Sequence, residues 1–426
     1  MIKIIQDLSS NRSEIFGVET AKKDVSSIVS EIIEEVKTDG DGALFALTEK
    51  FDKAKLSSLR VSQEEIEDGV SCVEPAFLEV LEKAAKNIRA FHEKQKRQGF
   101  ELSEQSGVVV GQKILPVERA GLYVPGGTAA YPSTVLMDAI PAKIAGVERV
   151  VMTTPPDKFG KINPVILAAA KIAGVDEIYK VGGAQAIAAL AYGTESVPKV
   201  DKIVGPGNAF VAEAKKQVFG QVSIDMIAGP SEIMIVADGK NRAKDIAADL
   251  LSQAEHDKMA SAVLVTDDLA FALKVSGEIE KQIPLLERAE IARASIDENG
   301  KIIVVRDLDQ AFEVVNELAP EHLEICLDEP FRYLEKVKNA GSVFLGRYCP
   351  EALGDYFAGT NHTLPTSGTA RFSSPLSVDD FLKKTQYIYY DKNALERVCK
   401  DVEYFAKKEG LTAHAKSAVV RFEDEQ

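Results

Sequence analysis

The sequence lacks the features of a secreted or membrane-spanning protein. Its four cysteines are far apart and form no C-x-x-C pair, and the segment 1–7 is not a charged and then apolar leader. We therefore expect a reducing, cytoplasmic location. The most apolar stretch, 165–175, is interrupted by Lys171 and is much shorter than the ~20 residues that cross a bilayer. No membrane span is expected.

Positive charge is also scarce. The chain has 66 acidic and 51 basic side chains, a formal charge of −15. This excess argues against binding to nucleic acid or to an anionic membrane, and favours small-molecule partners. With 426 residues and 45% hydrophobic composition, the chain is long enough for two or three domains with substantial cores.

No G-x-G-x-x-G fingerprint of a dinucleotide-binding loop occurs. The nearest glycine-rich turns are 121–127, 182–185 and 205–208. Such a turn between a strand and a helix can bring backbone N–H groups and a positive helix end to a pyrophosphate, with Gln185 and Asn208 in the first helical turn. The alternative is a set of tight turns that need glycine only for positive φ.

The first hundred residues have apolar side chains at helical spacing. We predict helices at 24–36, 41–51, 64–70 and 74–98. Short β-branched runs followed by glycine-rich turns and alanine-rich segments then predict alternating strands and helices, and hence buried parallel sheets. The predicted strands are 149–153, 177–181, 202–204, 232–237, 261–266, 301–305, 324–327 and 342–345, with helices at 241–255 and 308–318.

This alternation predicts an α/β protein with two successive α/β units between terminal extensions. The expected division is a mainly helical region 1–113, a first α/β domain 114–237, a second α/β domain 238–376, and a charged helical tail 377–426. We expect the first α/β domain to bind a nucleotide and the second to hold the metal and catalytic residues.

Histidine is rare, and four of the five imidazoles lie in motifs with a carboxylate or amide close by. They are His256, His322, His362 and His414, whereas His92 lies in a charged helical segment and is expected to be solvated. Imidazole binds transition metals and exchanges protons near neutral pH, so these motifs suggest a shared metal or acid–base site.

Gln253 and His256 are three residues apart at the end of a predicted helix, and therefore lie on one face. Asp355 follows the last predicted strand in a glycine-containing loop. With a third imidazole, these side chains have the nitrogen and oxygen donors of a zinc site, although their spacing matches no standard zinc motif. A solvated polar helix end is the alternative.

Glu321 and His322 follow Pro320, just before a predicted strand. An adjacent acid and imidazole suit proton transfer, and an exposed polar turn is the alternative. Three other functions stay open: an aldehyde dehydrogenase with Cys349 as nucleophile, a metal-dependent hydrolase without a nucleotide, and a catalytically silent binder.

Eight motifs, in order over nearly the whole chain, resemble those of the histidinol dehydrogenase family. They are Gly-Leu-Tyr-Val-Pro-Gly-Gly (121–127), Val-Gly-Gly-Ala-Gln-Ala-Ile-Ala-Ala-Leu (181–190), Lys-Ile-Val-Gly-Pro-Gly-Asn (202–208), Asp-Met-Ile-Ala-Gly-Pro-Ser-Glu (225–232), Asp-Leu-Leu-Ser-Gln-Ala-Glu-His (249–256), Asn-Glu-Leu-Ala-Pro-Glu-His-Leu (316–323), Gly-Asp-Tyr-Phe-Ala-Gly-Thr-Asn-His-Thr-Leu-Pro-Thr (354–366) and Glu-Gly-Leu-Thr-Ala-His (409–414).

The resemblance implies two incomplete Rossmann-like domains of the aldehyde-dehydrogenase type, with helical extensions, in an intertwined homodimer. It implies oxidation of L-histidinol through L-histidinal to L-histidine, the last step of histidine biosynthesis, with two NAD+ and one zinc ion per subunit. The tail is expected to reach the partner subunit, so that active sites are shared.

The resemblance also assigns residues. The zinc ligands are expected to be Gln253, His256, Asp355 and His414, the last from across the subunit interface. The expected bases are Glu321 and His322. Residues expected at the NAD site are Tyr123, Gln185 and Asn208. Substrate contacts are expected from Ser231, His322, His362 and Glu409, together with the zinc ligands.

Overall fold

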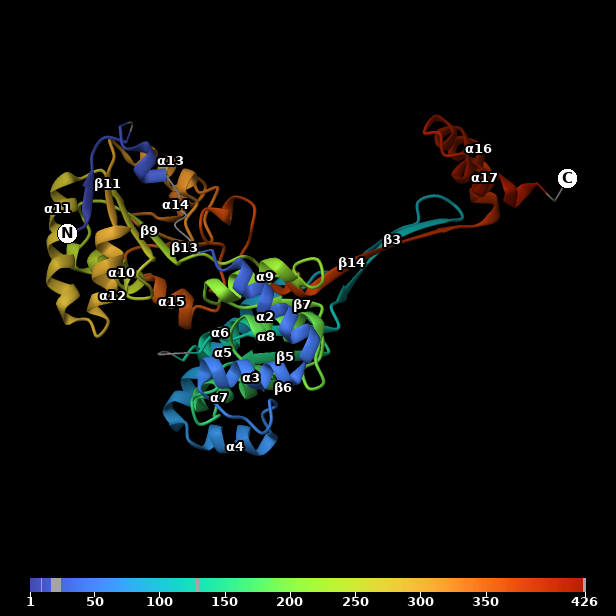
Figure 1. Cartoon of the computed structure of the whole chain (residues 1–426). Coiled ribbons are helices and arrows are strands. Elements are labelled where there is room, and N and C mark those ends of the chain that lie inside the picture. Colours follow the sequence, from blue (N-terminus) through green and yellow to red (C-terminus); the bar gives the residue numbers. More distant parts are fainter. Residues whose placement is uncertain (9, 17–23, 127–129, 424–426) are drawn as a thin grey trace. The chain divides into compact units, whose positions relative to one another are not determined.

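The structure, a computed structural model, describes residues 1–426 except 9, 17–23, 127–129 and 424–426. Internal contacts divide the chain into two units. The main unit comprises Met1–Gln95 and Val117–Phe381, and the small unit comprises Lys96–Pro116 and Leu382–Gln426. The main unit contains two parallel sheets, each with helices on both faces, which confirms the predicted α/β class (Figure 1).

The first sheet has the strand order β6-β5-β4-β7-β8, and all its pairs are parallel. Its strands are β4 Arg119–Tyr123, β5 Arg149–Thr154, β6 Glu177–Lys180, β7 Lys202–Val204 and β8 Ser223–Ile224. The chain runs from β4 outward to β6 and then returns to β7 on the other side of β4. The order of the strands therefore reverses between β4 and β7, where open α/β sheets bind ligands beyond the carboxyl ends of the strands.

The first sheet is covered by two groups of helices, because alternate side chains of its strands point to opposite faces. Leu122 and Met152 pack with α5, α6 and α7, whereas Tyr123 and Val151 pack with α2, α3, α8 and α9. The helices of this half, including α4, which packs with the first group, are α2 Ser26–Asp39, α3 Asp41–Asp52, α4 Gln63–Ser71, α5 Pro75–His92, α6 Pro132–Ala145, α7 Pro164–Ala173, α8 Gly183–Tyr192 and α9 Ala209–Val218.

The second sheet has the order β1-β11-β10-β9-β12-β13 and is also parallel. Its strands are β1 Lys3–Ile5, β9 Glu232–Ala237, β10 Ser261–Thr266, β11 Lys301–Val304, β12 His322–Cys326 and β13 Ser342–Leu345. Ile233 and Ile235 pack with α10, α11 and α12, whereas Met234 and Val236 pack with α13.

The helices of this half, in chain order, are α1 Arg12–Phe16, α10 Ala243–Ala254, α11 Leu269–Gln282, α12 Ala289–Glu298, α13 Leu308–Leu318, α14 Phe331–Leu334 and α15 Glu351–Tyr356. Single turns of 3-10 helix occur at η1 Glu93–Gln95, η2 Ile283–Leu285, η3 Thr369–Arg371 and η4 Val378–Phe381.

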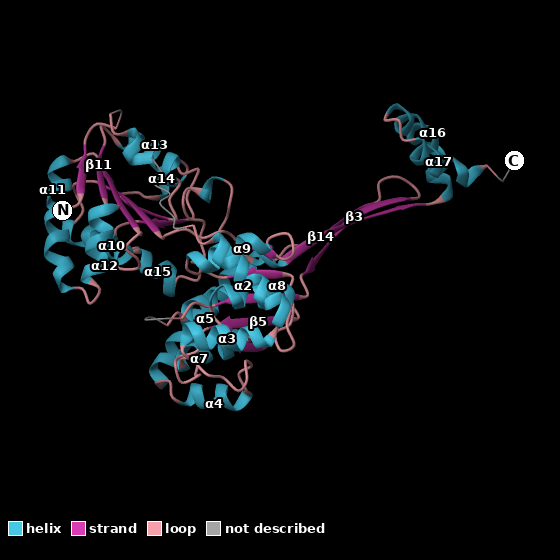
Figure 2. Ribbon diagram, viewed as in Figure 1, coloured by secondary structure: helices cyan, strands magenta, loops and turns pink. Residues whose placement is uncertain are grey.

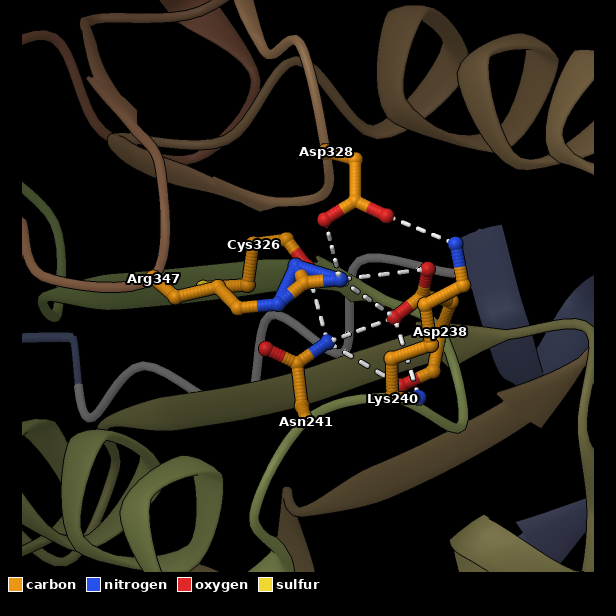
Figure 3. A network of polar contacts seen from close by, with 6 residues as sticks. All are labelled: Asp238, Lys240, Asn241, Cys326, Asp328 and Arg347. Carbon is orange, nitrogen blue, oxygen red and sulfur yellow. Dashed lines mark hydrogen bonds and ion pairs between the residues drawn. The ribbon is translucent and has the colours of Figure 1, made fainter.

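An ion-pair network lies beyond the carboxyl ends of β9, β12 and β13 of the second sheet (Figure 3). Arg347 lies 3.0 Å from a carboxylate oxygen of Asp238 and 3.2 Å from one of Asp328, and it donates to the main-chain carbonyl of Cys326 at 3.1 Å. Lys240 donates to Asp328 at 2.6 Å. The order of this sheet reverses between β9 and β12, so the network occupies the position where a Rossmann fold would bind its ligand.

The small unit is built on a three-stranded antiparallel sheet in the order β14-β3-β2 (Figure 2). Its elements are β2 Phe100–Leu102, β3 Val108–Pro116, β14 Leu382–Tyr390, α16 Lys392–Lys408, α17 Thr412–Val419 and η5 Val420–Phe422. The tail after 377 was predicted to be helical, and this was wrong for β14, which pairs with β3 along nine residues.

The prediction that His92 is solvated was also wrong. Its side chain, at the end of α5, is fully buried, and Nδ1 lies 2.7 Å from Oε1 of Gln95. Among the described residues, no helix is both long and apolar enough to span a membrane.

Candidate active site

The two residues expected to act as bases, Glu321 and His322, lie where β12 begins. His322 is the first residue of β12 and pairs with Ile233 of β9, so Glu321 adjoins Ser231 and Glu232 at the same edge of the sheet. Glu321 and His322 are both buried, and a carboxylate oxygen of Glu321 accepts the N–H of Glu232 at 2.8 Å. The alternative, an exposed polar turn, is excluded, because the acid–imidazole pair lies in the protein interior.

The tautomer of His322 follows from its surroundings. Nδ1 lies 3.0 Å from the main-chain oxygen of Glu232, which can only accept, so Nδ1 carries the proton. Nε2 is buried and has no hydrogen-bond partner. The nearest Asp355 oxygen is 3.8 Å from Nε2, which is too long for a hydrogen bond.

Carboxylates surround His322. Oxygens of Glu321 and Glu351 each lie 3.7 Å from Nδ1. Burial disfavours the imidazolium, but Glu321, Glu351 and Asp355 outweigh it and raise the pKa of His322 to about 10. Burial raises the pKa of Glu321 to about 8. At neutral pH the site therefore favours the protonated forms of Glu321 and His322. A cation bound nearby would lower both pKa values and favour the unprotonated bases.

Asp355 interacts electrostatically with three of the four predicted imidazoles, those of His256, His322 and His362. Burial raises the pKa of Asp355, but His322, His362 and His256 outweigh burial and hold the pKa below its usual value. The side chain was expected on a loop and lies instead in the short helix α15.

The other two expected cation ligands lie at the end of α10. Gln253 is buried in its last turn, and the N–H of His256 bonds the carbonyl of Gln253 at 3.1 Å just after the helix ends. His256 keeps an exposed face, and partial desolvation lowers its pKa although Asp355 acts in the opposite direction.

His362 approaches the site from a segment that is anchored on α6. Its Nε2 lies 3.3 Å from the hydroxyl of Thr134, and the next residue, Thr363, donates its hydroxyl to Asp138 at 3.0 Å. Burial is the main reason that the pKa of His362 lies below its usual value.

These residues fit a divalent cation. Three donor atoms, from His322, Glu351 and Asp355, lie within 4.8 Å of one another. Of the predicted ligands, only Asp355 belongs to this group. The side chain of Gln253 lies next to the group, against the carboxylate of Glu351. The imidazole nitrogen of His256, the carboxylate oxygens of Asp355 and the amide oxygen of the buried Gln253 are donor types that suit zinc or manganese.

Glu409 and His414 belong to the small unit. Glu409 directly follows α16, His414 lies in α17, and both side chains are exposed. Their expected contacts with substrate and zinc stay predictions.

The three residues predicted to bind NAD all line one cavity of about 1150 Å³. It lies at the carboxyl ends of the first sheet, where the strand order reverses between β4 and β7. Tyr123 accepts the N–H of Gly183 at 3.1 Å, and Gln185 is buried in the first turn of α8. Asn208 caps α9 by accepting the N–H groups of Phe210 and Val211, so its amide NH2 remains for a ligand. Gly127 of the preceding turn lies outside the described residues.

Two acids of the site, the buried Glu351 and the half-buried Glu232, were not predicted. Glu351 precedes Asp355 by four residues, a helical spacing that would have placed both on one face. Glu232 follows Ser231 directly, and burial raises its pKa to about 7. Glu351 lies in none of the eight motifs, and Glu232 ends one of them but received no role, since each residue makes its contacts with distant parts of the chain.

The chain is similar to known proteins over nearly its whole length. Residues 18–422 match the family model described as histidinol dehydrogenase. The chain is 57% identical over 401 residues to the histidinol dehydrogenase of Listeria monocytogenes, covering 94% of each chain. It is 54% identical to that of Clostridium acetobutylicum, covering 99% of each.

A solved structure agrees with these matches. The crystal structure of histidinol dehydrogenase from Elizabethkingia anophelis superposes with a TM-score of 0.94 at 39% identity, covering 99% of this chain and 98% of that one. The expected resemblance is thereby confirmed, and the chain belongs to the histidinol dehydrogenase family of oxidoreductases.

Proposed function

We propose that the protein oxidises L-histidinol through L-histidinal to L-histidine, with two NAD+ and one zinc ion per subunit, as the last step of histidine biosynthesis in the cytoplasm. The observation that carries the proposal is the buried His322, whose free Nε2 adjoins Asp355 and whose Nδ1 is held by the protein. A general base needs such a fixed nitrogen, and a cation bound beside Asp355 would lower the pKa of His322 and so favour its unprotonated form.

The reaction requires two hydride transfers, because an alcohol becomes an acid through an aldehyde. In the first, Nε2 of His322 takes the hydroxyl proton as hydride leaves the carbon for NAD+. Water must then add to the aldehyde, and Glu321, beside His322 at the start of β12, removes a proton from it. After His322 has released its first proton to solvent, it takes a hydroxyl proton of the hydrate as the second hydride leaves for a second NAD+, and L-histidine forms.

Zinc, when bound, would act as a template that binds the substrate's imidazole and amino nitrogens and fixes the reacting carbon. Gln253, His256 and Asp355 of the main unit would hold it, together with His414 from the small unit of the partner subunit. Ser231, His362 and Glu409 would orient the rest of the substrate, and the anchoring of His362 on α6 supports such a role.

NAD+ would occupy the cavity lined by Tyr123, Gln185 and Asn208. Its position at the reversal point of a parallel sheet supports this assignment, since backbone N–H groups and helix starts converge there. The cavity's size is also suited to a large cofactor.

We also propose a homodimer in which the small unit completes the partner's active site. Large apolar side chains of the small unit are exposed in one chain, at fractions of 72% for Ile388, 66% for Tyr404 and 67% for Phe405. Exposed apolar surface of this kind is typical of a protein interface.

The test is the number of NADH molecules formed per L-histidinol consumed, before and after removal of metal with a chelator. Two NADH per substrate, lost on chelation and restored by zinc, would support the proposal. One NADH would limit the protein to alcohol oxidation, and none would exclude the dehydrogenase. Thiol alkylation without loss of activity would remove Cys349 from the mechanism.

A further inference from the structure

Glu351 has no role in the proposed reaction, yet it is buried among the residues that carry it. It is the first residue of α15, four positions before Asp355, and its side chain is 3% exposed. A charged side chain at such a position requires partners, because burial of an unpaired carboxylate is strongly unfavourable.

The side chain of Gln253 is one of these partners. With its amide nitrogen toward Glu351, Gln253 donates to both carboxylate oxygens, at 3.1 Å to Oε2 and with a shorter contact to Oε1. The reverse orientation would place the amide oxygen against two carboxylate oxygens, which only accept. The carboxylate therefore selects one of the two amide orientations.

Glu351 is itself fixed by the surrounding fold. Its main-chain N–H donates to Oε1 of Glu324 in β12 at 2.8 Å, and the hydroxyl of Ser252 lies 3.5 Å from its Oε2. The main chain of Glu351 is thus tied to β12, and its carboxylate lies against α10, where it can hold the amide of Gln253 in register with Asp355 on α15.

We propose that Glu351 is a positioning residue, which fixes the amide of Gln253 so that its carbonyl oxygen is turned away from Glu351 and free to bind the cation. This inference rests on the proposed function, in which Gln253 is a zinc ligand. An amide binds a metal ion through its oxygen, and partners that orient a ligand contribute to affinity without touching the metal.

The alternative is that Glu351 binds the cation directly, together with His322 and Asp355. The two roles differ in what a substitution changes. Loss of a positioning residue weakens binding but leaves the same atoms on the metal, whereas loss of a ligand also alters the coordination.

The test compares the full-length protein with Glu351→Gln, after removal of metal, by competition for zinc against a chromophoric chelator. In this variant residue 351 is an amide, which can both donate and accept, so it no longer selects one orientation of the Gln253 amide. The variant should therefore bind zinc about 10–100-fold more weakly. Ser252→Ala is the matched control, since this hydroxyl reaches Glu351 but not the amide, and it should bind zinc within about threefold of wild type.

The double variant Gln253→Glu with Glu351→Gln exchanges donor and acceptor. The amide of residue 351 then donates to the carboxylate of residue 253, whose second oxygen stays free, so most of the lost affinity should return. Cobalt(II), bound in place of zinc, reports the ligands by its visible spectrum, which should be the same in wild type and Glu351→Gln at saturation. Thermal unfolding of the metal-free proteins shows that each variant is folded.

Three results would overturn the inference. Wild-type zinc affinity in Glu351→Gln would show that the carboxylate does not matter, and a changed cobalt spectrum would make Glu351 a ligand. Failure of the double variant to recover affinity would show that pairing with residue 253 is not the cause. If the wild-type protein bound neither zinc nor cobalt(II), the zinc site of the proposed function would be wrong, and the inference would fail with it.

Discussion

His322 and Glu232 begin neighbouring strands, and the ring of the one donates its Nδ1–H to the main-chain carbonyl of the other at 3.0 Å. A main-chain acceptor cannot change its protonation state or rotate away. The fold therefore fixes both the tautomer and the direction of Nε2, the atom that is left to act as base.

Replacing His322 by Asn tests this division of roles. The Asn amide can still donate to the Glu232 carbonyl, but it has no atom to replace Nε2. We expect NADH formation from L-histidinol to slow by about 10²–10⁴-fold, the usual contribution of a general base. Steady-state rates measure the loss, and zinc affinity within about threefold of wild type serves as the control for an intact site. A variant with near wild-type turnover would remove His322 as the base.

Glu321→Gln should separate the two oxidation steps. The amide oxygen can still accept the N–H of Glu232, so the loop should keep its structure, but the amide cannot remove a proton from water. Single-turnover NADH formation from L-histidinal should slow by about 10²-fold or more, and that from L-histidinol should slow less.

Glu232→Gln is the matched control for this prediction. Its carboxylate accepts the N–H of Ser367 at 3.1 Å and has no assigned proton transfer. Equal slowing of both steps in Glu321→Gln, or the same aldehyde defect in Glu232→Gln, would contradict the assignment.

Asp138 should make the protein less stable as pH rises. It is fully buried, and burial, with the nearby Asp225, raises its pKa well above the usual value. The folded protein therefore keeps a proton that the unfolded chain loses near pH 3.9, and folding stability falls above that pH until the folded pKa is passed.

Asp138→Asn removes this dependence while keeping an oxygen to accept the hydroxyl of Thr363. Relative to wild type, its free energy of unfolding should increase between pH 5 and pH 8, by up to about 1.4 kcal/mol per pH unit. Urea titrations at both pH values measure this, with the exposed Asp401→Asn as control. Parallel pH profiles for wild type and Asp138→Asn would show that the carboxyl ionises alike in both states.

The network around Arg347 allows a comparison of two cations that share Asp328 (Figure 3). Arg347→Met leaves Asp238 and the Cys326 carbonyl without this donor, and should cost about 1–3 kcal/mol. Lys240 is 71% exposed and its ion pair is screened by solvent, so Lys240→Met should cost much less than Arg347→Met. Denaturant unfolding measures both, and equal losses would mean that Arg347 contributes only a surface ion pair.

The parallel sheets could be predicted because their strands are buried on both faces and appear as short apolar runs. β9, β10 and β13 have the predicted bounds. β14 was missed because its side chains are mostly exposed, so it has no buried alternation, and its partner β3 lies more than 250 residues away. A charged, solvent-facing strand that depends on so distant a pairing cannot be distinguished from a helix by its sequence pattern.

The candidate site was predictable where a residue type carries the chemistry. His322 and Asp355 were found in this way, and the structure brings them within 3.8 Å. Glu351 and Glu232 were missed because their importance lies in burial and in contacts across the second sheet. The same burial explains His92, whose charged neighbours in sequence conceal an imidazole on the buried face of α5.

The shared active site is best tested with two inactive variants. His322→Ala damages the main unit and His414→Ala damages the small unit, so each homodimer should be inactive. If His414 acts on the partner's site, a heterodimer of the two has one site with both changes and one with neither. Heterodimers purified through two different affinity tags should then show about half of wild-type activity, as the symmetry of a twofold dimer requires. If each site is built within one chain, both sites carry a change and the heterodimer stays inactive, and the exchange of His414 between subunits would be wrong.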